Sequence, residues 1–184
     1  MTQGQATLVA AVIAATTALM GALAAGAVAL RNETRRRRAA AVDSDRLALR
    51  SQAANLFVHL FQLQHEMEWL TWHAVNRPGF LDRRLAAAYE SAVHAVYPKV
   101  LGAMAVLASL DLELYQTLQP LVDQLYNVEG AIGELITGLS HRRERTASLR
   151  RLSEYHSVVK TIYVDFPPRL AEAMQYADRR YTTG

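Results

Sequence analysis

The sequence predicts an all-α protein: one N-terminal transmembrane helix, followed by an antiparallel four-helix bundle whose helices are kinked at prolines. Three observations support this prediction. Residues 6–30 contain no charged side chain, four later stretches repeat apolar residues at the spacing of amphipathic helices, and no segment alternates with the period of a strand. The short connections between successive stretches favour an up-down-up-down order.

The uncharged segment 6–30 is long enough to cross a bilayer. It rises about 1.5 Å per residue, or roughly 37 Å in total, against about 30 Å of hydrocarbon. A cleaved signal peptide is the main alternative, but its start should be positive, and residues 1–5 carry no charged side chain. The arginines follow the segment instead, which places the rest of the chain in the cytoplasm by the positive-inside rule. These membrane-surface residues are Arg31, Arg35, Arg36, Arg37 and Arg38.

This orientation divides the chain into four parts. Residues 1–5 form a short extracytoplasmic tail, 6–30 the single transmembrane helix, 31–40 a basic juxtamembrane segment in contact with membrane lipids, and 41–181 the cytoplasmic helical bundle. Composition agrees: the pI is about 9.4, but the chain's net charge of +3 arises mainly next to the membrane segment. The 18 arginines beside two lysines are typical of a GC-rich bacterial genome, so we expect a bacterial cytoplasmic membrane. The chain has no cysteine, which excludes disulfides and thiolate metal sites.

Small residues recur at every fourth position of the membrane segment, and such rows allow helices to approach closely in lipid. One interpretation is that the segment self-associates; the other is that an alanine-rich composition produces the rows by chance. The predicted contact residues are Ala14, Ala18, Gly21, Ala22 and Gly26.

The first stretch of the bundle has the most regular seam, with alternating spacings of four and three. Its members are Leu49, Ala53, Leu56, Leu60, Leu63, Met67, Leu70 and Ala74, and it stops at Asn76-Arg77-Pro78-Gly79. Nothing after residue 30 forces a break, so one helix can continue from the membrane into the bundle. Four further aromatic residues lie off the seam: Phe57, Phe61, Trp69 and Trp72. Packing within the bundle explains one of these faces, and we predict a subunit interface at Trp69 and Trp72.

The other three helices are expected from similar seams. The second begins at the N-cap Asp82, with its seam at Tyr89, Val93, Val96, Val100, Ala103, Leu107 and Leu110. The third begins near Ser109 or Asp111, with its seam at Leu114, Leu118, Leu121, Leu125, Val128, Ile132, Leu135 and Leu139, and Gly138 and Ser140 mark its end. The fourth begins near Ala147 or Ser148, with its seam at Leu152, Tyr155, Val159, Ile162, Phe166, Leu170, Ala173 and Ala177.

Prolines inside these stretches predict bends or breaks. Pro98 should kink the second helix, and Pro120 should bend the third or open a separate short helix. Pro167-Pro168 should interrupt the fourth.

Few residues point to catalysis. The Glu-x-x-His pairs of metal-binding bundles are absent, as are phosphate loops, the Gly-x-Ser-x-Gly elbow and the His-Glu-x-x-His zinc motif. We therefore expect no metal and no cofactor. The most basic part of the bundle is residues 141–151, which we interpret as a solvated loop or as a contact for phosphates in RNA or lipid, or for a partner protein. Its candidate contact residues are Arg142, Arg143, Arg145 and Arg150.

Arg151-Leu-Ser-Glu-Tyr-His156 has an arginine and a histidine separated by four residues at the start of the fourth helix. This resembles the motif of HEPN-type proteins, whose ribonuclease members bring two such motifs together in a dimer. The anchor and bundle together resemble the membrane-anchored HEPN-like proteins that accompany some RNA-targeting CRISPR systems. The resemblance implies that His156 transfers protons and that Arg151 holds the phosphate, although Leu152 stands where the family commonly has a polar residue.

The leading hypothesis is a non-enzymatic, membrane-anchored protein that forms a homo-oligomer, as a scaffold or as a pore-like, membrane-perturbing effector in antiviral defence. The second hypothesis is a HEPN-type protein that cleaves or binds RNA at Arg151 and His156. The third is an adaptor that docks a partner through its basic loop.

Overall fold

The computed structural model describes the backbone of residues 3–139, 141 and 144–182, and within these ranges the side chains of residues 29–180. The elements are α1 (Gln3–Asn76), the 3-10 helix η1 (Pro78–Phe80), α2 (Arg83–Leu110), α3 (Leu112–Leu139) and α4 (Arg145–Thr182). No strand occurs among the described residues. The all-α prediction is confirmed, as is a first helix that continues from segment 6–30 into the first stretch of the bundle.

The chain divides into two compact units, Met1–Ser44 and Asp45–Gly184. In the first, the described side chains, residues 29–44, are exposed, and the five arginines predicted to meet lipid are among them. Arg37 pairs with Glu33 one turn earlier, at 2.8 Å. Ala14, Ala18, Gly21, Ala22 and Gly26 lie outside the residues whose side chains are described.

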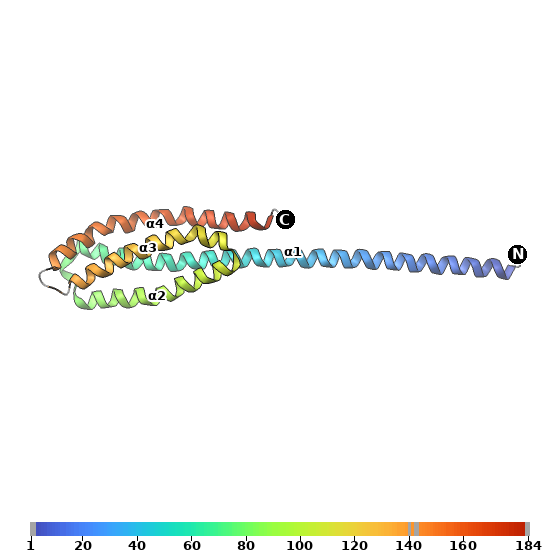
Figure 1. The fold of residues 1–184 in the computed structure, drawn as a ribbon, viewed down its shortest axis with the longest axis horizontal. Helices are drawn as coiled ribbons and strands as arrows, with labels where there is room; N and C mark the ends of the chain where they lie inside the picture. Colours follow the sequence, from blue (N-terminus) through green and yellow to red (C-terminus); the bar gives the residue numbers. More distant parts are fainter. Residues whose placement is uncertain (1–2, 140, 142–143, 183–184) are drawn as a thin grey trace. The chain divides into compact units, whose positions relative to one another are not determined.

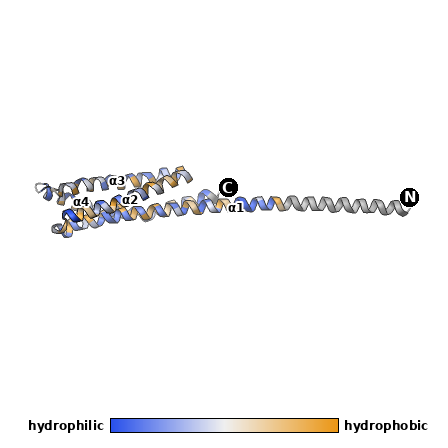
Figure 2. Ribbon diagram, turned by 90° about the horizontal axis from the view of Figure 1, so that it is seen from below, coloured by the Kyte–Doolittle hydropathy of each residue, from blue (hydrophilic) through white to orange (hydrophobic). Residues whose placement is uncertain are grey.

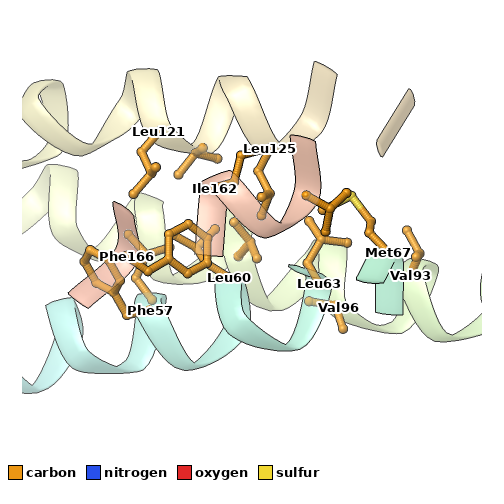
Figure 3. Close-up of a cluster of buried hydrophobic side chains, with 14 of the residues drawn as sticks. Phe57, Leu60, Leu63, Met67, Val93, Val96, Leu121, Leu125, Ile162 and Phe166 are labelled. Carbon is orange, nitrogen blue, oxygen red and sulfur yellow. The ribbon is translucent and has the colours of Figure 1, made fainter. Parts of the chain in front are cut away.

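In the second unit, four helical segments pack as a bundle, and successive helices run in opposite directions (Figure 1). Figure 2 shows apolar and polar residues as alternating stripes along them. All eight seam residues predicted for the first stretch are buried, which confirms that seam. Figure 3 shows how side chains from all four helices meet in this core. Its labelled members are Phe57, Leu60, Leu63, Met67, Val93, Val96, Leu121, Leu125, Ile162 and Phe166.

The start of α2 confirms the predicted cap Asp82, and α3 begins directly after Asp111, one of its two predicted starts. The Asp82 carboxylate accepts a hydrogen bond from the Leu85 backbone N–H at 2.9 Å, and the Asp111 carboxylate accepts one from Leu114 at the same distance. These bonds satisfy amide groups that the first turn of a helix leaves without a partner. The α2 seam is buried as predicted up to Leu107, but Leu110 in the last turn is 40% exposed, so its assignment to the core is wrong.

The predicted α3 seam is wrong at two positions in its second half, whereas Ile132 and Leu139 are buried as predicted. Val128 and Leu135 are only partly covered, whereas Glu129 and Ile136 are buried. An α-helix has 3.6 residues per turn, so a seam drawn at strict heptad spacing drifts away from the buried side along the helix. At Glu129 and Ile136 the core position lies one residue later than predicted, which places a carboxylate inside the bundle.

The prolines break none of the helices. α2 continues through Pro98, α3 begins at Leu112 well before Pro120, and α4 continues through Pro167 and Pro168. The predicted interruption of the fourth helix is therefore wrong, as is a separate helix opening at Pro120. All four prolines are exposed, so the carbonyl that each leaves without an N–H partner lies on the outer side of its helix, where water can satisfy it.

Among the described residues, α2 is the one helix long and apolar enough to cross a membrane. A third of its most apolar stretch is buried inside the bundle. The same composition suits a core helix, and the seam of α2 has that role here.

Candidate functional site

The outer face of α1 carries large apolar side chains that the bundle leaves uncovered. It carries Leu47, Val58, Trp69 and Trp72, all exposed. Successive members are eleven, eleven and three residues apart, so they lie on one side of the helix, opposite the buried seam, with the exposed polar residues Ser51, Gln62 and His65 among them. We call these four residues the outer stripe of α1.

The off-seam aromatic residues divide into two groups, as predicted. Phe57 is buried and its ring packs edge-on against Phe166 of α4 at 6.1 Å between centroids. Phe61 packs against Phe166 at 4.9 Å and Tyr163 at 5.7 Å. Packing within the bundle therefore covers both phenylalanines, whereas Trp69 and Trp72 remain 37% and 39% exposed.

The two tryptophans hold His73 between them. The His73 ring lies 4.5 Å from the Trp69 ring and 5.0 Å from the Trp72 ring, centroid to centroid. Its Nδ1 atom is 2.8 Å from the Trp69 carbonyl oxygen, so Nδ1 carries the proton and donates it. These contacts fix the indoles as a preformed aromatic surface at the end of α1.

The α1–α2 and α3–α4 connections lie at the same end of the bundle, which we call the tip (Figure 1). Arg145, at the start of α4, donates from its guanidinium to the backbone oxygen of Leu81 at 2.8 Å. Arg150 is exposed and pairs with Glu154 at 3.4 Å. Arg142 and Arg143 lie outside the described residues. Of the four predicted phosphate contacts, the structure thus places two, and Arg145 also ties the two connections together.

Arg151 and His156 lie on different sides of α4. Residues five apart on a helix are separated by about 140°, and the fully buried Leu152 lies between them. Arg151 is exposed, whereas His156 is half-buried, with its Nδ1 3.2 Å from the Thr71 hydroxyl oxygen of α1. That hydroxyl donates to the Met67 carbonyl at 2.8 Å, so its oxygen accepts from His156 Nδ1. No hydrogen bond or ion pair joins Arg151 to His156 among the described residues.

A buried carboxylate between α2 and α3 was missed by the sequence analysis. Glu129 is 8% exposed and accepts hydrogen bonds from the hydroxyls of Tyr97 and Tyr89, the latter at 3.4 Å. The Tyr126 ring packs edge-on against Tyr97 at 4.9 Å, and its hydroxyl is buried without a partner among the described residues. The available signal was spacing: Leu125, Glu129, Ile132 and Ile136 also form a seam, with glutamate at a core position.

This cluster raises the pKa of its phenols. Burial contributes most to the raised pKa of Tyr89, followed by the negative charge of Glu129. Burial and then the hydrogen bond to Glu129 raise the pKa of Tyr97, and burial also raises that of Tyr126. The phenols therefore stay protonated and act as donors to the carboxylate. These hydrogen bonds satisfy the buried Glu129 carboxylate and link α2 to α3.

The opposite end of the bundle carries a second polar cluster. Asp111 accepts from the Tyr176 hydroxyl at 3.1 Å and pairs with Arg180 at 3.4 Å. Burial, followed by hydrogen bonds to Glu113 and Asp111, raises the pKa of Tyr176. Beside it, α3 and α4 line an open cleft of about 470 Å³ whose apolar floor is edged by two arginines and two carboxylates. These opposite charges balance, so the cleft has no net charge to select an ionic ligand.

In the part of the chain whose side chains are described, no three histidine or acidic side chains are grouped closely enough to hold a metal ion. Comparison of the chain with protein-family models, curated proteins and solved structures finds no match.

Proposed function

We propose that the chain is a membrane-anchored, self-assembling helical protein at the cytoplasmic face of a bacterial membrane. Segment 6–30 is its single-pass anchor, with the N-terminus outside. In this proposal the oligomer is a scaffold or a pore-like effector that perturbs the membrane, with a role in phage defence. The uncovered outer stripe of α1 is the observation that carries the proposal.

The stripe fits a second copy of the same helix. Apolar positions repeat along it at nearly whole numbers of turns, and the outward positions between Leu47 and Val58 are the small residues Ser51 and Ala54. Small residues let two helices approach closely, while the larger ones pack in layers. None of these outward positions carries a formal charge, so identical stripes do not repel each other.

The anchor favours the same contact. Copies inserted with the same orientation present their α1 helices in parallel and at a raised local concentration, which increases the effective affinity of a weak interface. The small-residue rows at Ala14, Ala18, Gly21, Ala22 and Gly26 would add a contact within the bilayer.

Mass measurement of the full chain in mild detergent tests assembly. We expect an oligomer for the natural sequence and a shift toward monomer for W69S/W72S. The matched control is L101S/V106S, which removes two exposed apolar side chains from α2 and should leave the oligomer intact. A monodisperse monomer of the natural sequence would defeat the proposal. If G21L/G26L leaves the oligomer unchanged, the anchor does not drive assembly.

Two further measurements separate the parts of the proposal. Resistance of the full-length chain to alkaline carbonate extraction is expected if segment 6–30 spans the bilayer, and a freely soluble mature chain would exclude the anchor. Leakage of a trapped dye from vesicles carrying the protein is expected of a membrane-perturbing oligomer, whereas intact vesicles favour a scaffold.

An RNA-cleaving or RNA-binding function is the alternative proposal. One observation favours it: the Thr71 hydroxyl orients the His156 ring and leaves Nε2 as the free acceptor, as a proton-transferring histidine requires. Arg151 would have to come from a neighbouring copy, because the two side chains diverge within one chain. The proposal expects R151A and H156A each to abolish cleavage of single-stranded RNA by the full-length protein, with R169A, an exposed arginine elsewhere on α4, as the control. Unchanged cleavage in both variants would exclude this site.

A further inference from the structure

The charge of the bundle is concentrated at the tip. Residues 45–184 contain fifteen basic and fifteen acidic side chains, so this unit has no formal net charge. Residues 77–84 and 141–151, the two connections, hold eight of these basic side chains and only two of the acidic ones. The sequence separates these segments by more than fifty residues, whereas the Arg145–Leu81 hydrogen bond joins them. The tip is thus the positive pole of an otherwise acidic bundle.

Phe80 projects from this positive pole. It ends η1, is 66% exposed, and follows Pro78 and Gly79, which are exposed as well. A side-chain carbon added at Gly79 would meet nothing within 4 Å, so this position faces open space. Transfer of an exposed apolar ring from water into an apolar medium lowers its free energy.

The turn holds Phe80 in this position. The Phe80 N–H donates to the Arg77 carbonyl at 2.9 Å, and the Asp82 N–H donates to the Phe80 carbonyl at 2.8 Å. The adjacent Leu81 is fully buried and fastens the turn to the core. The Arg77 guanidinium lies 5.8 Å from the centre of the Phe80 ring, and Arg83 and Arg84 are exposed on the first turn of α2. The exposed Phe80 ring, in a turn held by backbone hydrogen bonds, therefore lies beside the Arg77 guanidinium and near Arg83 and Arg84 in the sequence.

We infer that the tip docks onto the surface of a bilayer containing anionic lipids. Phe80 enters the boundary between headgroups and acyl chains, and the arginines pair with lipid phosphates. Apolar burial and attraction to anionic headgroups add in such contacts. A protruding ring suits a soft, flat surface better than single-stranded RNA, which is bound in basic grooves lined by stacking platforms. This contact goes beyond the proposed anchor, because it lies at the end of the bundle opposite Asp45.

The test uses the full-length chain in nanodiscs of phosphatidylcholine, so that any anchor is already occupied. Vesicles of phosphatidylcholine, with or without 30% phosphatidylglycerol, are added, and nanodiscs that float with the vesicles are measured. We expect binding only to the anionic vesicles, and weaker binding as salt is raised. F80S should weaken binding by about tenfold or more, and R83Q/R84Q by a similar factor at low salt.

Matched controls remove an equal group elsewhere on the bundle. L101S deletes an exposed apolar side chain from α2 and R169Q an exposed arginine from α4, and both should bind as the natural chain does. Equal binding to neutral and anionic vesicles, or equal losses in the controls, would overturn the inference. Binding of polyuridine that F80S and R83Q/R84Q weaken, without vesicle binding, would assign the tip to RNA instead. Carbonate extraction reports on the anchor separately, so the two ideas can fail independently.

Discussion

Gly138 is the position where a single methyl group should disturb the contact between α3 and α4. A Cβ atom built on Gly138 lies 2.4 Å from the Ser148 hydroxyl oxygen, about 1 Å closer than ordinary van der Waals contact allows. Gly138 is inside α3 and no described glycine has positive φ, so alanine fits the backbone there. The glycine lies one residue before the end of α3, as the sequence predicted, and its missing side chain also permits the close approach of α4.

The expected effect of G138A is the difference of two terms. Overpacking a tight site costs about 1–3 kcal/mol, and replacing glycine by alanine in a helix returns about 0.8–1 kcal/mol. We expect a net loss of roughly 0.5–2 kcal/mol. The melting temperature should fall by about 2–4 °C per kcal/mol in a chain of this size.

Two companion variants isolate the cause. S148A removes the clashing oxygen, and the remaining neighbours of the new Cβ lie at 3.6 Å, so G138A/S148A should recover at least about 1 kcal/mol relative to G138A. G130A adds the same methyl group where nothing lies within 4 Å and should stabilise the protein by about 0.5–1 kcal/mol. Urea unfolding of the full chain in detergent, followed by circular dichroism, measures all of them. Equal stability of G138A and G130A would refute the steric argument.

Four further changes test the packing and the polar cluster. E129L leaves the Tyr97 and Tyr89 hydroxyls without an acceptor and should lower the free energy of unfolding by about 1–3 kcal/mol. E129Q keeps an acceptor oxygen and should lower it less. Equal unfolding midpoints for the two variants would contradict this. The raised pKa of Tyr89 keeps its proton in the folded state above pH 10, where the unfolded chain loses it, so stability should be level below about pH 10 and fall above it. The fall is at most about 1.4 kcal/mol per pH unit for this tyrosine, and Y89F should show a shallower decline in unfolding midpoints across alkaline pH. F166A removes the ring against which Phe57 and Phe61 pack and should cost about 3–5 kcal/mol in urea unfolding, whereas a loss below about 1 kcal/mol would mean that the site is not core. D82A removes the α2 cap and should cost about 0.5–2 kcal/mol, and D82N, which can still cap, should lose clearly less.

The parts of the fold that local chemistry determines were predictable. The α1 seam, its stop at Asn76, the cap Asp82 and the start of α3 near Asp111 depend on residues within one or two turns. The α3 seam failed at Val128 and Leu135 because the helical period differs slightly from the heptad, so strict heptad spacing departs from the buried side of a long helix. The prolines were wrongly expected to interrupt helices. A helix tolerates proline where water can hydrate the carbonyl left without an N–H partner, and which carbonyls face water depends on tertiary packing.

The candidate surfaces were predictable only in part. Trp69 and Trp72 stood out because they lie off the seam, but only packing shows that Phe57 and Phe61 are covered and the tryptophans are not. The basic character of residues 141–151 was evident from the sequence. That this segment lies at the same end of the bundle as Phe80, Arg83 and Arg84 depends on how the helices pack. Glu129 was missed because a carboxylate is rarely buried without hydrogen-bond donors, and its donors, Tyr89 and Tyr97, come from another helix. The transmembrane segment and the roles of Arg151 and His156 stay predictions.

The boundary of the compact unit has a practical consequence. The unit starts at Asp45, ahead of Leu49, its first core residue, so a chain shortened to residues 45–184 keeps every side chain that the structure describes as buried. Because that fragment has no formal net charge at neutral pH, it should be least soluble near the conditions of most assays. Mildly acidic or alkaline buffers would restore repulsion between copies and make the isolated bundle tractable.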